Sequence, residues 1–291
     1  MLAQFLQFTM SGLTVGAVYA IVGLGFTIIY NASGVLNFAQ GEFVMIGGMV
    51  SVFAVAAGVP LPLAIVLAVL VAALVGVALQ RFAIEPARDA SPVVLIIITI
   101  GGALVIRGLA QIIFDKQLHK LAGFSGEAPI NFFGASILPQ ALWVLGGATV
   151  IVALVSLFMT KTMLGKAVLA TSANRLAAQL VGVNTSVILA ISFALSAAIG
   201  AVAGILITPI TFTHIEVGTM LALKGFAALV LGGLGSPVGA ILGGMVLGLC
   251  EALSAGYLSS TYKDAFAFLV MIGVLIVMPN GLVGTISSER V

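Results

Sequence analysis

Long, continuously apolar runs alternate with short polar segments along most of the chain. A helix rises about 1.5 Å per residue, so about 20 apolar residues can cross the roughly 30 Å hydrocarbon core of a bilayer. Nine runs approach this length and are predicted to be membrane-spanning helices: residues 11–30, 41–59, 61–80, 92–114, 141–160, 187–208, 220–234, 237–258 and 265–278.

These runs predict an all-α polytopic membrane protein, with residues 1–291 forming a single transmembrane domain. A membrane β-barrel would instead show strands of about ten residues in which apolar and polar side chains alternate. The run at 220–234 is short, and Gly235, Ser236 and Pro237 separate it from the next, so it could be a complete or a broken span. The expected number of spans is therefore eight to ten.

Composition narrows the class of protein further. Hydrophobic residues make up 62% of the chain and charged residues only 7%, whereas a soluble domain has about 25% charged residues. A soluble enzyme and a disordered chain are both excluded, and the lipid bilayer is the expected surrounding. A net charge of +2 gives no sign of a nucleic-acid partner. The single cysteine, Cys250, excludes an intramolecular disulfide.

The distribution of basic residues predicts an orientation. With nine spans and the N-terminus outside, the cytoplasmic connections contain six basic residues: Arg81, Arg88, Lys161, Lys166, Arg175 and Arg290. The outer connections contain only Lys116, Lys120 and Lys263. Because cytoplasmic loops carry an excess of Lys and Arg, the N-terminus is expected on the periplasmic side and the C-terminus in the cytoplasm. The polar outer segment 115–140 could face an extracytoplasmic partner or be a plain connecting loop.

Two polar segments interrupt the apolar pattern, at residues 31–42 and 208–218. Each combines Gly or Pro with hydrogen-bonding side chains and has one acid near its end, Glu42 or Glu216. Irregular backbone at membrane depth must be buried in protein or line a wet cavity. The two breaks lie five elements apart, so they would have opposite orientations, as in transporters built from inverted repeats. Two ordinary polar turns at opposite membrane faces explain the pattern equally well.

Three charged residues, Arg107, Lys224 and Glu251, fall inside apolar runs. A charge buried in the membrane costs a few kcal/mol and usually faces a cavity or a partner. Arg107 and Lys224 lie within about two helical turns of a span end, so extension of the side chain toward the membrane surface is the simpler explanation. Glu251 lies deeper, where a proton or a hydrogen bond would have to neutralise it.

Glycine is abundant, with 35 residues, and many of these are four positions apart, as at Gly12 and Gly16 or Gly244 and Gly248. This spacing lets helices approach closely in lipid. The densest stretch, 232–244, is not a nucleotide loop, because the pattern G-x-x-x-x-G-K-[ST] occurs nowhere in the chain. The chain alone is therefore not expected to hydrolyse ATP, and no cofactor or metal site is predicted.

The cytoplasmic segment 161–186 predicts a short amphipathic helix at about residues 165–182. Its apolar stripe consists of residues four and three positions apart: Leu169, Ala173, Leu176, Leu180 and Val183. Gly165 precedes the predicted helix, and Gly182 follows it as a C-terminal stop. Such a helix could dock to a soluble protein or lie flat in the lipid headgroups. The absence of aromatic residues from the stripe favours a protein groove.

The stretch GAVYAIVGLGFTIIYNASGVLNFAQGEFVMIGG (residues 16–48) closely resembles the H-type membrane permease subunit of high-affinity branched-chain amino-acid ABC importers. The resemblance continues through LGKAVLATSANRLAAQLVGVN (164–184), FALSAAIGAVAGIL (193–206), LKGFAALVLGGLGSPVGAILGG (223–244) and PNGLVG (279–284). Together these stretches cover most of the chain in the expected order.

This resemblance implies one permease half of an importer in a bacterial inner membrane. Its partners would be a second, related permease, two cytoplasmic ATP-binding subunits and a periplasmic substrate-binding protein. The amphipathic segment would be the coupling helix that sits in an ATPase groove, with the candidate residues Gly165, Lys166, Asn174, Arg175 and Gly182. Leu169 departs from relatives, which often carry a basic residue there, so a salt bridge at this position is not expected.

The implied mechanism is ATP-driven alternating access, in which Leu, Ile or Val follows a largely apolar path with a few polar contacts. The candidates for those contacts are Asn31, Asn37, Gln40 and Glu42 at the first break and Thr211, Thr213 and Glu216 at the second. Similar permeases for urea, amides or other amino acids remain alternatives. A secondary transporter driven by protons or sodium would also have broken helices and intramembrane acids. An enzyme is disfavoured, because the predicted spans contain neither a His/Glu metal cluster nor a Ser–His pair.

Overall fold

The structure, a computed structural model, describes residues 2–132 and 134–283. Arg290 and Gly284, which enter the sequence analysis, lie outside the described residues. The elements in chain order are α1 (Leu2–Ser33), α2 (Gln40–Ala56), α3 (Leu61–Leu79), η1 (Gln80–Ile84), η2 (Glu85–Ala87), α4 (Pro92–Ile113), β1 (Ile130–Phe132), β2 (Ala135–Ile137), α5 (Pro139–Lys161), α6 (Met163–Ala173), α7 (Arg175–Leu180), α8 (Thr185–Thr211), α9 (Val217–Gly232), α10 (Pro237–Tyr257) and α11 (Lys263–Val277).

Each of the nine predicted spans is a helix, which confirms an all-α polytopic membrane protein. Six helical segments among the described residues are long and apolar enough to cross a membrane: Leu2–Ser33, Leu61–Ala87, Pro92–Ile113, Pro139–Lys161, Thr185–Thr211 and Pro237–Tyr257. The helices α2 and α9 are shorter but equally apolar. The seventh predicted span is one unbroken helix, α9, of 16 residues. Ser236 caps the start of α10 by accepting a hydrogen bond from Gly239 N, as the expected turn requires.

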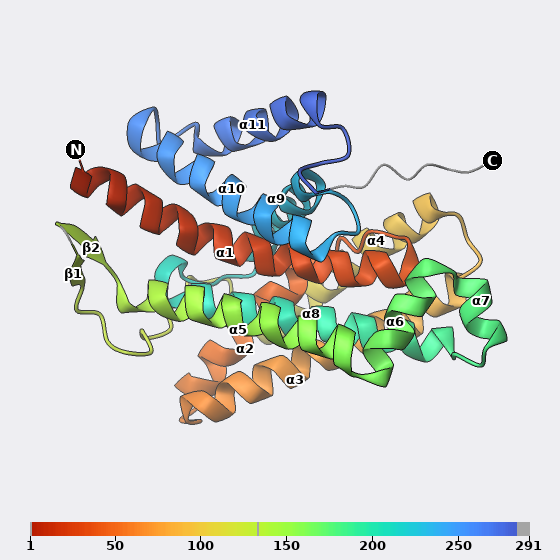
Figure 1. The fold of residues 1–291 in the computed structure, drawn as a ribbon. Coiled ribbons are helices and arrows are strands. Elements are labelled where there is room, and N and C mark those ends of the chain that lie inside the picture. The colour runs from red at the N-terminus through yellow and green to blue at the C-terminus, as the bar shows by residue number, and fades with distance from the viewer. Residues whose placement is uncertain (1, 133, 284–291) are drawn as a thin grey trace.

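Helix α1 runs along the length of the molecule, between α10 on one side and α5 on the other (Figure 1). Its segment from Gly16 to Ile29 is buried at every position. The helices α1 and α10 meet through Gly16 and Gly244, where a Cβ on Gly16 would lie 3.0 Å from the carbonyl oxygen of Gly244. The predicted role of the glycine pairs in helix packing is thereby confirmed, since side chains at these positions would separate the two backbones.

Small residues also pack α3 against its neighbours. The buried positions Ala64, Ala68, Ala72 and Gly76 recur every four residues along one face of α3. Large apolar side chains occupy its other faces and are exposed: Leu63, Val66, Leu67, Leu70 and Leu74. A water-soluble protein rarely exposes so continuous an apolar surface, so this side of α3 is suited to contact with lipid or with another membrane helix.

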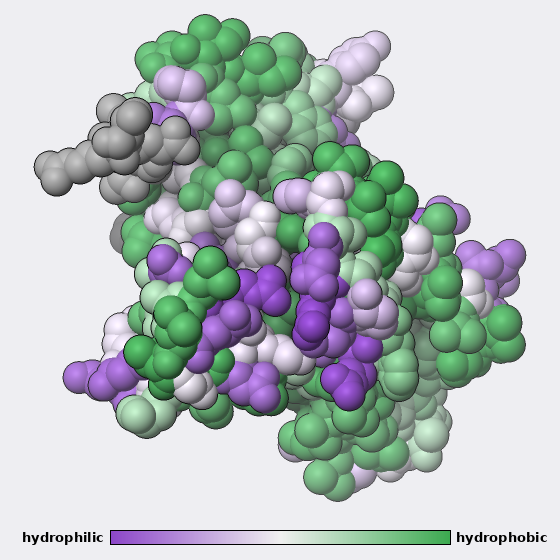
Figure 2. All heavy atoms as spheres, turned by 90° about the vertical axis from the view of Figure 1, so that its right-hand side faces the viewer, coloured by the Kyte–Doolittle hydropathy of each residue, from purple (hydrophilic) through white to green (hydrophobic). Residues whose placement is uncertain are grey.

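Figure 2 shows the end of the molecule that carries α6 and α7. Hydrophilic side chains gather near the centre of this end, and apolar side chains dominate the flanks. This distribution is expected for a membrane protein viewed from the aqueous phase, because the flanks contact lipid and the end contacts water.

The two breaks are shorter than predicted. Helix α1 continues to Ser33 and α2 begins at Gln40, so Asn31, Gln40 and Glu42 are helical. Thr211 is also helical, because α8 continues past Pro209 to Thr211. The irregular backbone is confined to residues 34–39 and 212–216. The second of these begins at Phe212, whose positive φ of 63° ends α8.

The predicted single helix at 165–182 is wrong, because two helices replace it. Helix α6 ends at Ala173, and Asn174 has the extended backbone (φ −158°, ψ 105°) typical of a cap. The side chain of Asn174 accepts a hydrogen bond from Ala177 N, 2.9 Å away, and so begins α7. Gly165 lies inside α6 and does not precede it. Gly182 follows α7 with a φ of 91°, as predicted for a stop.

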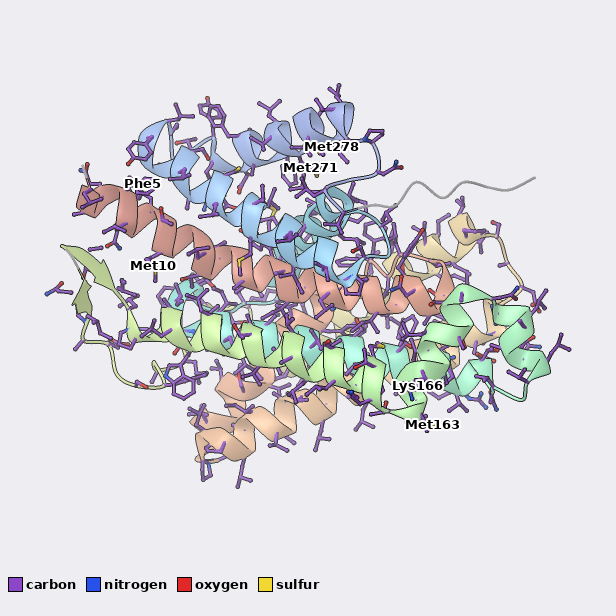
Figure 3. The ribbon with its side chains drawn as sticks, in the orientation of Figure 1. Phe5, Met10, Met163, Lys166, Met271 and Met278 are labelled. Carbon is purple, nitrogen blue, oxygen red and sulfur yellow. The ribbon has the colours of Figure 1, made fainter. Side chains whose placement is uncertain are left out.

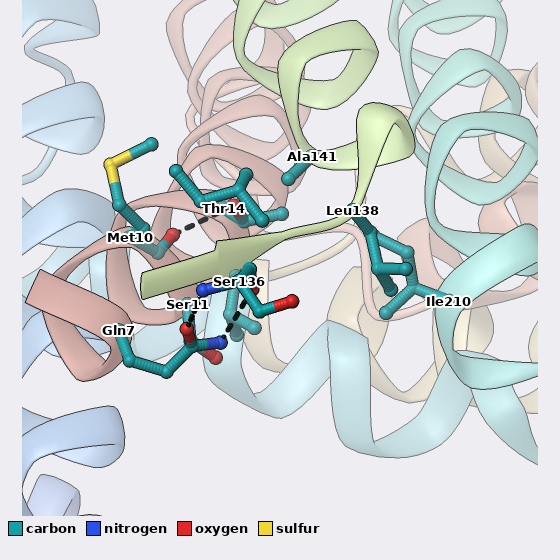
Figure 4. Close-up of a pocket in the computed structure, with 10 residues that line it drawn as sticks. Gln7, Met10, Ser11, Thr14, Ser136, Leu138, Ala141 and Ile210 are labelled. Atoms are coloured by element: carbon teal, nitrogen blue, oxygen red, sulfur yellow. Dashed lines mark hydrogen bonds between the residues drawn. The ribbon is translucent and has the colours of Figure 1, made fainter. Parts of the chain in front are cut away.

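The segment between α4 and α5 contacts the helices at two described places. His119 and Thr213 exchange two backbone hydrogen bonds of 2.9 and 2.8 Å, which attach the segment to the second break. The β1–β2 hairpin is held to α1 because Gln7 donates to Ser136 O and accepts from Ser136 N, at 2.8 and 2.7 Å. A small cavity of about 120 Å³ lies beneath this contact, between α1, β2 and α5 (Figure 4).

Candidate functional site

The N-terminal ends of α2 and α9 meet at Gly41 and Gly218. A Cβ on either glycine would overlap the backbone carbonyl oxygen of the other, so the two backbones are in direct contact. Each helix begins directly after one of the breaks, and neither has a side-chain cap on its first free N–H groups. The positive ends of two helix dipoles therefore converge inside the helical bundle.

Three of the predicted residues are buried around the first break. Asn37 Oδ1 accepts from Ala39 N at 3.1 Å, while its Nδ2 has no hydrogen-bond partner in the described part of the chain. Gln40 donates from Nε2 to the carbonyl of Ser196 at 3.2 Å, and its Oε1 lies 2.6 Å from the Ser196 hydroxyl. The side chain of Glu42 is 2% exposed. Ser196 thus links α8 to the start of α2.

Asn31 lies apart from this group, near the end of α1. Its Nδ2 donates to Gly235 O at 3.0 Å. Asn31 lines a mainly apolar cavity of about 290 Å³ between α1, α5, α6 and α10, and also an adjoining cavity of about 610 Å³. The second cavity has a more polar lining that includes Ser33, Thr171 and Arg175.

The predicted residues of the second break separate. Thr213 is buried and its hydroxyl has no hydrogen-bond partner among the described residues. A Cβ on Gly48 would lie 2.5 Å from that hydroxyl, which places it against α2. Thr211 and Glu216 are exposed and do not join the buried group.

Arg107 does not extend to the membrane surface, so that prediction is wrong. Its Nη2 donates to Glu42 Oε1 and, at 2.7 Å, to Thr219 Oγ1. An ion pair inside the protein replaces the hydration that the surface would have supplied. The side chain of Arg107 on α4 thus joins the first turns of α2 and α9, the two helices that follow the breaks.

Lys224 is also paired inside the protein, which contradicts the predicted extension to the surface. Its Nζ lies 2.8 Å from both carboxylate oxygens of Glu251 and 2.6 Å from Asp264 Oδ1. Tyr19 donates its hydroxyl to Glu251 Oε2 at 2.7 Å. Glu251 is therefore neutralised by its neighbours, and the cluster joins α1, α9, α10 and α11.

The predicted coupling residues lie at the end of the molecule where α6 and α7 project, and Figure 3 shows Met163 and Lys166 there, opposite Phe5 and Met10. Lys166 and Arg175 are exposed. Gly165 is buried, and a Cβ there would overlap the Phe158 carbonyl. Three apolar side chains of this region, Leu176, Leu180 and Val181, are at least 73% exposed.

Four residues of these clusters had no signal in the sequence. Ser196 and Thr99 lie in ordinary apolar runs, yet Ser196 binds Gln40 and Thr99 accepts a hydrogen bond from Phe38 N at 3.2 Å. Thr219 and Asp264 each lie in the first turn of a helix, where polar residues are common. The partners of Arg107 and Lys224 depend on how the helices rotate about their axes.

Comparison with known proteins places the chain in a family. A sequence model described as the branched-chain amino acid transport system / permease component matches residues 8–275. The permease LivH of Escherichia coli is 34% identical over 99% of this chain and 98% of its own length. BraD of Pseudomonas aeruginosa is 31% identical, with the same coverage of both chains.

The solved structure of PsaBC from Streptococcus pneumoniae shares the fold, with a TM-score of 0.50 at 14% identity over 95% of each chain. The match to the sequence model extends over both helix breaks and over α6 and α7. The chain therefore belongs to the family of permease components of branched-chain amino acid transport systems.

Proposed function

We propose that this chain is one permease half of an ABC importer and that it carries branched-chain amino acids inward across a bacterial inner membrane. The observation that supports this most strongly is the 34% identity over nearly the whole length to LivH, a high-affinity branched-chain amino acid permease. Similarity over the whole length supports a shared activity, whereas similarity over a part would support only a shared segment. BraD, also a permease of a high-affinity branched-chain amino acid transport system, supports the same substrate class.

Transport by this chain depends on ATP-binding subunits, because its own sequence has no phosphate-binding loop. The exposed apolar residues Leu176, Leu180 and Val181 offer a docking surface for those subunits at one end of the molecule. Two such subunits, a second related permease and a periplasmic binding protein complete the importer. No cofactor is held by the permease itself.

Movement of α6 provides a route from the ATP-binding subunits to the substrate. Val168 and Leu169 of α6 line the 290 Å³ cavity, whose other walls come from α1, α5 and α10. A shift of α6 therefore changes the shape of this cavity directly, as alternating access requires. Aliphatic side chains such as Leu24, Ile28 and Ile241 suit a branched apolar substrate, and Asn31 marks the transition to the more polar cavity.

The seven predicted polar residues remain our candidates for contacts along the path: Asn31, Asn37, Gln40, Glu42, Thr211, Thr213 and Glu216. Gly41 follows the first break and Gly218 follows the second, and each contacts the backbone of the other in the same way. This symmetric contact supports an inverted repeat.

The distribution of Lys and Arg supports a periplasmic N-terminus. In a chain with Cys250 replaced by Ala, a cysteine at Gln117 should react with an impermeant maleimide in intact cells. A cysteine at Lys166 should react only after permeabilisation.

Uptake by proteoliposomes tests the function. They would contain this chain, its partner permease and the ATP-binding subunits, with the binding protein added outside. Leucine, isoleucine and valine should accumulate only when ATP is present on the cytoplasmic side. Uptake that persists without the ATP-binding subunits and stops with an uncoupler would favour an ion-driven transporter. Preference for urea or an amide over leucine would replace the substrate class.

A further inference from the structure

The ion pair between Glu42 and Arg107 is incomplete on both sides. Arg107 contacts Glu42 through a single nitrogen, Nη2, and the same nitrogen also binds Thr219. Glu42 Oε2 and Arg107 Nε are buried and have no hydrogen-bond partner among the described residues. Arginine usually binds a carboxylate through two parallel hydrogen bonds. This pair therefore keeps one charged acceptor and one charged donor unused.

The Lys224 cluster shows what a closed intramembrane charge cluster looks like in the same protein. Both oxygens of Glu251 accept hydrogen bonds, from Lys224 and from Tyr19. A buried polar group without a partner destabilises the fold, and more so if it is charged. A stabilising role accounts for the closed cluster, but it does not explain why the Glu42–Arg107 pair leaves two charged atoms unsatisfied.

The Glu42–Arg107 pair is also partly exposed, on the side of Arg107. The side chain of Arg107 is 23% exposed although that of Glu42 is only 2% exposed. Thr219, which shares Arg107 Nη2, lies on the surface of α9. Leu223 lies one turn further along the same face of α9 and is 43% exposed, which adds an apolar surface beside the polar group. A ligand can therefore approach the exposed part of Arg107 from the α9 side, and access to Glu42 behind it requires a movement of the Arg107 side chain.

The unused atoms define the chemistry of that ligand. Glu42 Oε2 is an acceptor for a cationic donor, and Arg107 Nε is a donor for an anionic acceptor. The uncapped N-terminal ends of α2 and α9 meet beside the pair and add positive potential, which favours a carboxylate. An α-amino acid zwitterion carries an ammonium and a carboxylate on one carbon, so it matches both atoms at once.

We propose that Glu42, Arg107 and Thr219 form a transient binding site for the charged end of the transported amino acid. The ammonium binds Glu42, the carboxylate binds Arg107 and Thr219, and the apolar side chain lies toward Leu223. This proposal rests on the proposed function, since it concerns the same substrate. It adds Arg107 and Thr219, which sequence patterns did not connect to Glu42, and it assigns each charge of the substrate to one residue.

The test uses the complete importer in proteoliposomes, with leucine-loaded binding protein in excess. Leucine uptake and ATP hydrolysis are measured in parallel for wild type, Arg107→Lys, the charge swap Glu42→Arg with Arg107→Glu, and the neutral double variant Glu42→Gln with Arg107→Gln. A charge-assisted hydrogen bond contributes about 1.5–3 kcal/mol, so each variant should hydrolyse at least about tenfold more ATP per leucine carried. The thermal midpoint of the purified complex reports assembly.

A matched control is the double variant Lys224→Gln with Glu251→Gln, which should lower uptake and ATP hydrolysis together and leave their ratio unchanged. If the charge swap restores the wild-type ratio, the pair has only a structural role and the proposal is wrong. The proposal also fails if the neutral double variant carries leucine at the wild-type ratio. If the neutral double variant does not assemble, the test uses Arg107→Lys and the charge swap, which keep both charges. Their ratios of ATP hydrolysed to leucine carried are then compared with the wild-type ratio. A wild-type complex that accumulates no leucine would instead overturn the proposed function, and this proposal with it.

Discussion

Gly41 and Gly218 lie backbone to backbone, although 177 positions of sequence separate them, and each occupies the space where the other would carry a Cβ. The two residues begin the helices that follow the two breaks. This contact brings both helix starts next to Arg107 and so creates the polar group around Glu42. The close approach depends on glycine at both positions, because any side chain would meet a carbonyl oxygen that the helix cannot move.

Replacement of Gly41 by Ala should therefore separate α2 from α9. Overpacking of this kind costs about 1–3 kcal/mol, so we expect a lower thermal midpoint of the purified complex and reduced uptake. Gly101→Ala is the matched control, since that glycine lies inside α4 and no atom of the described residues lies within 4 Å of the added Cβ. Gly218→Ala should resemble Gly41→Ala, and the double variant should cost less than the sum, because both changes open the same contact. Equal midpoints for Gly41→Ala and Gly101→Ala would contradict the close packing.

Removal of the charge at Lys224 should strongly destabilise the fold. Lys224→Met leaves the buried Glu251 with only Lys263, 3.4 Å away, as a cationic partner, and loss of one member of a buried ion pair costs about 3–5 kcal/mol. Adding Glu251→Gln to Lys224→Met should recover part of that loss, because the uncompensated charge is removed as well. Thermal unfolding of the purified complex measures both effects. A double variant as unstable as Lys224→Met alone would show that Glu251 is not the partner that matters.

The apolar pattern predicted every long helix because a bilayer imposes both length and apolar character. The pattern could not predict the break at Asn174, because the apolar stripe continues across it from Leu169 to Leu180. A helix of six residues such as α7 depends on its cap and its neighbours more than on its own pattern. The two breaks are shorter than the polar pattern predicted, because polar residues such as Asn31 and Gln40 lie inside helices and form hydrogen bonds from there.

The candidate site was only partly visible in the sequence. Glu42 stood out as an acid at membrane depth, and Arg107 as a base in an apolar run. Their pairing joins α2 to α4 across 65 residues, and it depends on the rotation of each helix, which the apolar pattern of a helix buried on several sides does not define. Glu216 looked equivalent to Glu42 but is exposed, because α9 begins one residue after it.

The backbone of Phe212 is strained, and a glycine there should relieve the strain. Its φ of 63° and ψ of 169° fall in a region that is nearly restricted to glycine and costs other residues about 1–3 kcal/mol. Phe212→Ala removes the same ring but keeps the strain, so it is the matched control. We expect the Gly variant to be more stable than the Ala variant by about 1 kcal/mol, measured by thermal unfolding of the complex. The opposite order would mean that the second break does not require this conformation.

The start of α7 depends on the cap that Asn174 provides. Asn174→Ala removes the hydrogen bond to Ala177 N, which costs about 1 kcal/mol, and a six-residue helix has little else to hold it. Under the proposed function, α7 carries the docking surface with Leu176 and Leu180, so ATP hydrolysis stimulated by the binding protein should fall several-fold. Asn174→Ser keeps a capping oxygen and should restore most of that activity. Ser172→Ala is a nearby control, because Ser172 is exposed and its hydroxyl donates to the Leu169 carbonyl within the same helix. Equal activity of the Ala and Ser variants at position 174 would show that the cap does not govern docking.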